Sequence, residues 1–307
     1  MSTRPFITPE IFFKSAQDQN GDHYATITPW DKAKLSLAAV TQLNEISEDT
    51  WNRSALSRLA SSLHPFLWVK EEAEWQRVVQ RFDKVCKKAH DLDVSLLVDA
   101  EESWMQDAAD ALVEDMMRRY NIKKTIVFNT LQTYRWDRLL YLEELHQRAQ
   151  KEGFKIGVKV VRGAYMEKEI DRAATMGYPS PICATKAETD ANFNETVAYI
   201  LNNLKDISIF AGTHNEESCY LIMERMRKKG LPKNHYGIWF GQLYGMSDHI
   251  SFNLAAHGYN VAKYLPFGPV RDVMPYLIRR AEENTSVAGQ TSRELTLLKK
   301  ERKRRKI

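Results

Sequence analysis

The chain has 307 residues, of which 43% are hydrophobic and 27% are charged, and its formal net charge is +4. This length suits one large domain, and α/β barrels commonly form a single domain of about 250 residues. No apolar stretch approaches the roughly 20 residues of a membrane-spanning helix. Residues 1–21 have neither a signal-peptide core nor the arginine-rich, acid-poor composition of a transit peptide.

The charge distribution and the cysteines indicate partners and compartment. Residues 299–307 hold seven basic residues and one acidic residue, so this basic tail contributes +6 and the rest of the chain −2. A body with that balance is not expected to bind nucleic acid. The cysteines Cys86, Cys183 and Cys219 lack metal-ligand spacing and are typical of free thiols in a reducing compartment. We expect a cytoplasmic protein whose tail is either solvated or in peripheral contact with the inner membrane.

The first 70 residues carry few structural signals. Residues 35–43 are apolar enough for a strand or for the start of a helix, and periodicity does not distinguish the two. Residues 71–92 predict an amphipathic helix, because six apolar residues share one helical face. These residues are Trp75, Val78, Val79, Phe82, Val85 and Cys86.

From residue 94 onward, short apolar strands alternate with helices. The expected strands are 94–98, 125–128, 155–161, 207–211, 236–240 and 259–265, and the expected helices are 104–120, 134–152, 166–176, 189–204, 216–229 and 248–257. Strands that are apolar on both faces and separated by helices indicate a parallel sheet covered by helices. Because the chain has no Gly-x-Gly-x-x-Gly motif and no Walker loop, a β/α barrel is favoured over a Rossmann or P-loop fold.

Polar side chains follow or end five consecutive strands, where barrel enzymes carry their chemistry. They are Asp99, Asn129, Gln132, Lys159, Arg162, Thr213, His214 and Gln242. Each has an ordinary structural alternative: Asp99 can cap a helix, for example, and His214 can be a structural histidine. Together they favour one shared ligand. Asp-x-x-x-Asp and His-x-x-x-His spacings are absent from these strand ends, so a metal hydrolase is disfavoured and no metal is expected.

The stretch from residue 264 to 284 predicts turns followed by a helix. Tyr276, Arg279, Arg280 and Glu283 share one face of that helix, and paired arginines suit a carboxylate or a phosphate. The alternative is a solvated face on which Arg279 and Glu283 form an ordinary ion pair. Val273, Leu277 and Ala281 recur every four residues, so we expect them to form a buried stripe.

Six motifs in this order resemble those of proline dehydrogenase, the flavin-dependent enzyme that oxidises L-proline. They are VDAEE (98–102), FNTLQTY (128–134), KVVRGAY (159–165), THNEE (213–217), GQLYGM (241–246) and YLIRRAEEN (276–284), and the resemblance covers about residues 75–302. It implies a distorted (β/α)8 TIM-like barrel whose last helix lies over the flavin. We therefore expect a divergent segment at 1–70, a flavin-binding barrel at 71–298 and the basic tail at 299–307.

The resemblance also implies roles for individual residues. Asp99 and Lys159 would be catalytic. Arg279 and Arg280 would clamp the substrate carboxylate, and Tyr264, Tyr276 and Leu243 would form the wall around the pyrrolidine ring. The implied FAD contacts are Ala100, Gln132, Lys159, Arg162, Gly163, Ala164, Thr185, Lys186, Thr213, His214 and Glu283.

The chain departs from the family pattern at two places. Many bacterial members have arginine where this chain has Lys159, which keeps the charge but lacks the guanidinium fork. The family also has two barrel strands before the one that ends at Asp99, and the second carries a substrate-binding lysine. Residues 1–70 show no matching strand, although Lys32 and Lys34 are the nearest lysines. We expect the N-terminal strands to be diverged or incomplete.

The resemblance implies hydride transfer from C5 of L-proline to flavin N5, which yields 1-pyrroline-5-carboxylate. Electrons would pass to a membrane quinone, and a separate pyrroline-5-carboxylate dehydrogenase would take the product. Three alternatives stay open. The chain could be a hydroxyproline dehydrogenase, a Schiff-base barrel lyase using Lys159, or a non-catalytic descendant of the family.

Overall fold

The computed structural model describes residues 65–271, 273–278, 296 and 299–305, and for residues 65–72 it describes the backbone alone. The expectations for residues 1–64, including Lys32 and Lys34, therefore lie outside the described residues. So do those for Arg279, Arg280 and Glu283.

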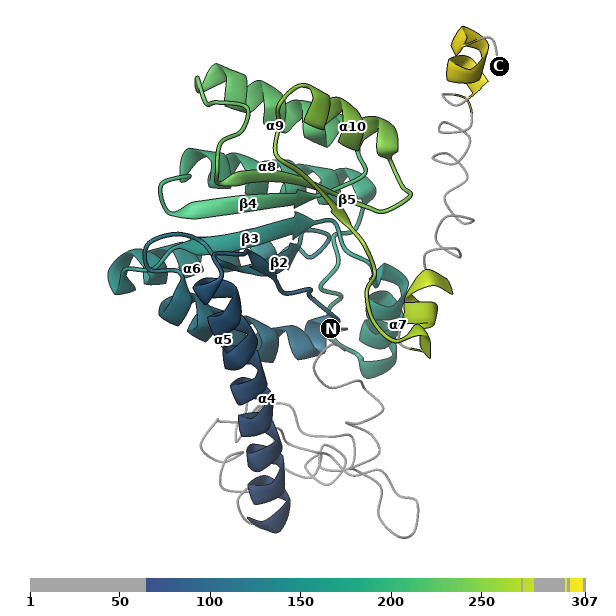
Figure 1. Ribbon diagram of the computed structural model, residues 1–307. Helices are drawn as coiled ribbons and strands as arrows, with labels where there is room; N and C mark the ends of the chain where they lie inside the picture. The colour runs from purple at the N-terminus through teal and green to yellow at the C-terminus, as the bar shows by residue number, and fades with distance from the viewer. Residues whose placement is uncertain (1–64, 272, 279–295, 297–298, 306–307) are drawn as a thin grey trace.

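Six parallel strands form one curled sheet, which we call the half-barrel (Figure 1). In chain order they are β1 (Leu96–Leu97), β2 (Val127–Gln132), β3 (Ile156–Val161), β4 (Ile207–Gly212), β5 (Ile238–Leu243) and β6 (Val261–Tyr264). Each strand pairs with the next one along the chain, so their order in the sheet is the sequence order. The expected β/α architecture is confirmed for the described part of the chain.

Helices connect the strands and cover the outer face of the sheet (Figure 1). They are α4 (Pro65–Asp91), α5 (Ser103–Tyr120), α6 (Arg138–Glu152), α7 (Met166–Met176), α8 (Lys186–Asn202), α9 (Glu216–Lys228) and α10 (Asp248–Ala256). The core lies between this layer and the strands. Val158 and Ile209 from the sheet pack with Leu142 and Phe193 from the helices, and all four are fully buried. Alternate residues of β3, such as Lys159, face the inside of the half-barrel because side chains alternate along a strand.

Asn121 joins α5 to the sheet at the N-terminal end of the strands. Its Oδ1 accepts hydrogen bonds from the backbone amides of Ile126 (2.9 Å) and Val127 (2.8 Å). Its Nδ2 donates to the carbonyls of Val127 (2.8 Å) and Lys155 (3.0 Å). This fully buried side chain therefore satisfies backbone groups of the loop that enters β2 and of the residue that precedes β3.

Two strands extend further than their apolar runs predicted. β2 continues to Gln132 and β5 continues to Leu243, so Gln132, Gln242 and Leu243 lie in strands and do not follow them. The reason is that inward-facing polar groups find partners inside the half-barrel. Thr130 Oγ1, for example, donates to the carbonyl of Val98 at 2.6 Å. β1, by contrast, has only two residues.

The buried stripe expected on the last helix is wrong for the residues that can be checked. Val273 is half-buried and Leu277 is 42% exposed, while Ala281 lies outside the described residues. Figure 1 shows this helical segment beside α7 at the end of the sheet, so the sheet does not cover it. Leu277 instead lines a shallow apolar hollow of about 230 Å³ with Phe267 and Met274.

Candidate active site

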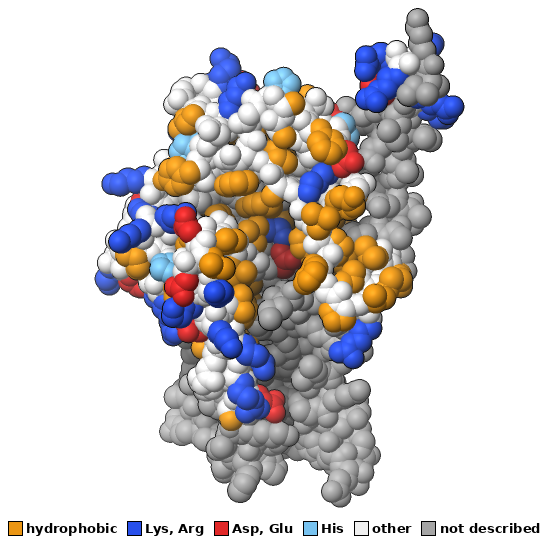
Figure 2. Space-filling view, viewed as in Figure 1, with side chains coloured by type: hydrophobic (Ala, Val, Ile, Leu, Met, Phe, Trp, Pro, Cys, Tyr) orange, Lys and Arg blue, Asp and Glu red, His pale blue; other side chains and the backbone are white. Residues whose placement is uncertain are grey.

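A lysine–aspartate ion pair lies at the C-terminal end of the half-barrel. Lys159 points inward from the middle of β3, and its Nζ contacts Oδ1 of Asp99, which lies two residues after the end of β1. Since β2 lies between β1 and β3, the contact depends on the curl of the sheet. Gly212 allows β4 to lie close to β3 here, because a Cβ at this position would come within 2.9 Å of Val161 Cγ1. Figure 2 shows a hollow on this face in which basic and acidic side chains lie together.

Gln132 ends β2 and presents an open acceptor at the same end. Its Nε2 donates to the carbonyl of Glu101 at 2.5 Å. Its Oε1 is buried and has no hydrogen-bond partner within the described parts of the chain. Buried acceptors are nearly always satisfied, so a donor on a bound molecule is the simplest partner for this oxygen.

Arg162 follows β3 and is held by groups from three other elements. Its Nε donates to Asp190 on α8 (2.7 Å), and its Nη atoms donate to Ser218 on α9 (3.0 Å) and to Thr213 after β4 (3.3 Å). The guanidinium also lies 4.5 Å from the centre of the Phe193 ring. The fork is thus fixed before any anion binds.

Lys186 shares Asp190 with this arginine. Its Nζ lies 2.5 Å from Asp190 Oδ2. Burial opposes ionisation of Asp190, but the hydrogen bonds from Lys186 and Arg162 outweigh it and lower the pKa of the carboxyl group. The structure therefore brings Arg162 and Lys186 together around one carboxylate, with Thr213 on the other side of the guanidinium.

The turn after β3 requires a glycine. Gly163 has φ +137°, and a Cβ there would come within 2.5 Å of the Tyr134 ring. The amide of Tyr134 donates to the Arg162 carbonyl at 2.6 Å, which fixes the same turn, and Ala164 beyond it is exposed. Thr185 has a capping role: it is the N-cap of α8 and accepts from the Glu188 amide at 3.1 Å.

His214 and Gln242 hold the loops at the ends of β4 and β5. His214 Nδ1 lies 2.9 Å from Oγ of Ser247. Gln242 donates to the Thr213 carbonyl (3.1 Å) and accepts from Ser251 (2.8 Å). Both side chains therefore connect neighbouring loops at this end of the sheet.

The two tyrosines expected to surround the substrate ring are in contact with each other. The ring centres of Tyr264, at the end of β6, and Tyr276, in the last helical segment, lie 5.6 Å apart at an angle of 55°. Leu243 ends the neighbouring strand β5, where its register partner is Tyr264. These aromatic rings and the leucine form a partly apolar side of the C-terminal end.

The sequence analysis assigned no role to Tyr165 or Glu101, yet they contact each other at this end. The Tyr165 hydroxyl donates to Glu101 Oε2 at 2.7 Å. Both residues lie inside the quoted motifs, so their motif membership was the available signal. Asn129, in contrast, faces away from the site: it donates to the buried Asp110 (2.7 Å), which also pairs with Arg138 (2.8 Å). The expectation that Asn129 addresses a shared ligand is wrong.

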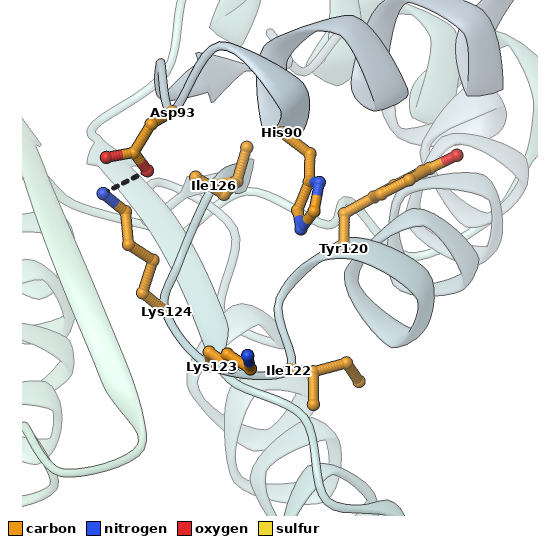
Figure 3. Close-up of a pocket in the computed structure, with 7 residues that line it drawn as sticks. All are labelled: His90, Asp93, Tyr120, Ile122, Lys123, Lys124 and Ile126. Carbon is orange, nitrogen blue, oxygen red and sulfur yellow. Dashed lines mark ion pairs between the residues drawn. The ribbon is translucent and has the colours of Figure 1, made fainter.

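A separate hollow lies at the opposite end of the strands (Figure 3). Its volume is about 350 Å³, and it is lined by His90, Asp93, Tyr120, Ile122, Lys123, Lys124 and Ile126. These residues come from the ends of α4 and α5 and from the segments that lead into β1 and β2. Barrel enzymes carry their chemistry at the C-terminal ends of the strands, so this hollow is not the candidate active site.

Comparison with known proteins identifies the family. Residues 15–293 match the sequence model described as proline dehydrogenase, which is most of the chain. The chain belongs to the proline dehydrogenase family. Proline dehydrogenase 1, mitochondrial, of Homo sapiens is 41% identical over 232 residues, which cover 75% of this chain and 39% of that protein. The Drosophila melanogaster protein of the same name is 38% identical, with coverage of 81% and 38%.

A bacterial relative aligns over more of its own length. The carbapenem antibiotics biosynthesis protein CarD of Pectobacterium carotovorum subsp. carotovorum is 39% identical over 291 residues, which cover 87% of this chain and 74% of that protein. The chain thus spans about two fifths of the length of the two mitochondrial proline dehydrogenases and about three quarters of CarD.

Solved structures confirm the barrel-like fold. Proline utilization A from Bdellovibrio bacteriovorus, inactivated by N-propargylglycine, superposes with a TM-score of 0.65 at 28% identity, covering 71% of this chain and 23% of that one. A Bradyrhizobium japonicum proline utilization A mutant gives 0.62 at 25% identity, with coverage of 73% and 23%. Within residues that the structure describes, no helix is long and apolar enough to cross a membrane, and no cluster of three or more acidic, histidine or cysteine side chains could hold a metal ion.

Proposed function

We propose that the protein oxidises L-proline to 1-pyrroline-5-carboxylate with FAD as its cofactor. The observation that carries the proposal is the Lys159–Asp99 ion pair beside the open Gln132 acceptor, at the end of the half-barrel where this fold performs chemistry. Membership of the proline dehydrogenase family supports the choice of substrate.

The residues at this end fit a flavin. Gln132 Oε1 is buried and lacks a donor among the described residues, and the flavin ring carries an N–H group that suits such an acceptor. Lys159 supplies a positive charge at the same end, where negative charge develops when a flavin is reduced. Arg162 supplies a fixed guanidinium for an anionic group of the cofactor. When bound, FAD supplies the acceptor for a hydride.

The protein's own residues position the substrate and hold charge. As a hydride leaves C5 of L-proline, a proton leaves the ring nitrogen and the C5–N single bond becomes a double bond. Lys159 keeps its charge in place through Asp99. We assign binding of the substrate carboxylate to Arg279 and Arg280, which lie outside the described residues, and the ring wall to the paired tyrosines and Leu243. Because these residues hold C5 in one orientation, binding energy lowers the barrier to hydride transfer.

The remaining cofactor contacts are proposals of the same kind. They are Ala100, Gly163, Ala164, Thr185, Lys186, Thr213, His214 and Glu283. Of these, Thr213 and Lys186 are supported by their contacts with the Arg162–Asp190 pair. Thr185 is the least supported, because its hydroxyl already caps α8.

The acceptor of the electrons and the fate of the product complete the proposal. We assign the electrons to a membrane quinone and the product to a separate pyrroline-5-carboxylate dehydrogenase. The basic tail would bring the protein to the anionic surface of the inner membrane from the cytoplasm. Residues 299–305 of this tail are helical and highly basic, which suits such a surface.

Anaerobic reduction tests the function. The protein is loaded with FAD under nitrogen and mixed with L-proline, trans-4-hydroxy-L-proline or buffer while the flavin absorbance is followed. We expect L-proline to bleach the flavin band and hydroxyproline to bleach it more slowly. Faster bleaching by hydroxyproline would reassign the substrate, and bound flavin that neither compound reduces would indicate a non-catalytic descendant.

A Schiff-base lyase is the alternative from another class. The Lys159 ammonium is engaged by a carboxylate, an arrangement that serves charge stabilisation better than nucleophilic attack. Borohydride added with a carbonyl compound should therefore leave no adduct on Lys159. A Lys159 adduct together with failure to bind FAD would overturn the proposed function.

A further inference from the structure

Ser247 has a backbone conformation that serine rarely adopts. Its φ is 50° and its ψ is 41°, which lie in the left-handed region. Among non-glycine residues that the structure describes, Asp93 (φ 56°) is the only other one with a positive φ. Aspartate adopts this region more often than most residues do, whereas serine is not among the residues enriched there. Strained backbone of this kind persists only where surrounding contacts enforce it, and it often marks a functional site.

The Ser247 side chain does not cap the helix that begins after it. Ser247 occupies the N-cap position of α10, where serine normally adopts extended backbone and accepts a hydrogen bond from an amide of the first turn. Here its side chain makes no capping hydrogen bond. The Ile250 amide, which such a side chain could accept from, donates instead to the Ser247 carbonyl at 3.0 Å. The hydroxyl is therefore used elsewhere at the expense of helix capping.

The hydroxyl is directed at a histidine of the neighbouring loop. Ser247 Oγ lies 2.9 Å from Nδ1 of His214, which follows β4 at the C-terminal end of the half-barrel. The serine is 4% exposed, so this hydrogen bond is well shielded from water. Because the serine hydroxyl can donate or accept, the hydrogen bond is compatible with either tautomer, but it restricts the orientation of the ring and therefore the direction in which Nε2 points.

Several contacts hold the loop in this strained shape. Lys263 of β6 donates to the Met246 carbonyl at 2.6 Å and pairs with Asp248 at 2.7 Å, on either side of Ser247. His249 pairs with Glu216 at the start of α9 at 2.8 Å. The backbone on both sides of the serine is thus fixed by neighbouring elements, as persistence of strain requires.

We infer that Ser247 is a positioning residue that fixes the orientation of the His214 ring for contact with the cofactor. The inference rests on the proposed function, in which His214 contacts FAD. Ser247 acts through the histidine and does not touch the cofactor.

Three variants separate this role from a structural one. Ser247→Gly removes the hydroxyl and relieves the positive φ, whereas Ser247→Ala removes the hydroxyl and keeps the strain. Asp93→Gly is the matched control, because it relieves a positive φ at the other end of the strands. It loses only the exposed ion pair with Lys124. Melting temperature, imidazole ¹⁵N spectra of the FAD-free protein and FAD affinity are measured for each.

The melting temperature and the His214 hydrogen bond should respond differently to the three variants. We expect Ser247→Gly and Asp93→Gly to melt at or above the wild-type temperature and Ser247→Ala to melt below it. The Nδ1 resonance of His214 should be the same in wild type and Asp93→Gly and should shift in both Ser247 variants, because only these lose the hydrogen bond at Nδ1. Both Ser247 variants should bind FAD about threefold to tenfold more weakly, as expected for one lost hydrogen bond.

The readouts distinguish the possible failures. Unchanged His214 signals and FAD affinity in Ser247→Gly and Ser247→Ala would overturn the inference. Altered His214 signals with FAD affinity equal to that of Asp93→Gly would leave the hydrogen bond standing and remove its role in cofactor binding. Wild-type protein that binds no FAD would refute the proposed function and the positioning role together, and the ¹⁵N spectra would then report on the contact alone.

Discussion

Two lysine–aspartate ion pairs involve β3, one just before the strand and one that reaches from its middle to the C-terminal end of the half-barrel, and they have different surroundings. Lys155, which precedes the strand, pairs with Asp206 at 2.9 Å. Asp206 also accepts hydrogen bonds from His146 and Gln150, both at 3.3 Å, and its side chain is 21% exposed. Lys159 pairs with Asp99 at the C-terminal end, where the aspartate is 58% exposed.

The difference separates structural polar groups from functional ones. The groups around Asp206 satisfy one another, so they can serve the fold without a ligand. The C-terminal end instead holds an exposed carboxylate and a buried Gln132 acceptor without a partner among the described residues. Unsatisfied buried groups are costly, and proteins retain them mainly where a ligand or a reaction uses them.

The largest expected effect on stability lies at the N-terminal end. Asn121→Ala leaves three buried backbone groups and one half-buried group without their side-chain partner, so we expect a loss of about 3 kcal/mol in the free energy of unfolding. Asn203→Ala is the control, since the half-buried Asn203 side chain donates only to the Tyr199 carbonyl and should cost less than about 1 kcal/mol. Urea unfolding measures both. Equal losses of unfolding free energy in the two variants would show that the Asn121 side chain does not stabilise the contact between α5 and the sheet.

A smaller effect concerns acid stability. The hydrogen bond from Lys155 lowers the pKa of Asp206 to about 2, despite the opposing effect of burial. Because the folded-state pKa lies below the unfolded value, the carboxylate stabilises the fold above pH 4. This contribution is lost as the pH falls from about 4 to about 2.

Comparison with Asp206→Asn isolates this contribution. Wild type should be more stable than the variant by less than about 1 kcal/mol near pH 6, because solvent still reaches both partners of the ion pair and screens it. The difference should disappear towards pH 2 in urea titrations at several pH values. A difference that grows on acidification would contradict the assigned ion pair.

The sequence predicted the β/α alternation well because each strand is apolar and each helix has an amphipathic pattern. It placed the end of β2 too early, because apolarity does not signal inward-facing residues such as Thr130 and Gln132. It also assigned Asn129 to the site, since only the strand's alternation shows that this side chain faces Asp110.

The sequence predicted individual residues of the site, but it did not predict the contacts between them. Asp99 and Lys159 were both named from motifs, yet their pairing depends on the curl of a sheet in which β2 separates their strands. Ser247 gave no signal, because serine is common at helix starts and its left-handed backbone is visible only in three dimensions.

The most direct test compares Lys155→Met with Lys159→Met, each of which removes one of the two ion pairs. The measurement is the rate constant for anaerobic flavin reduction by L-proline in rapid mixing. We expect Lys159→Met to lower this rate constant about 100-fold with bound flavin retained, because the charge stabilises the reaction. In Lys155→Met, L-proline should reduce the flavin at the wild-type rate, and only the free energy of unfolding should fall. Equal rate constants in the two variants would contradict the assignment of chemistry to the C-terminal end.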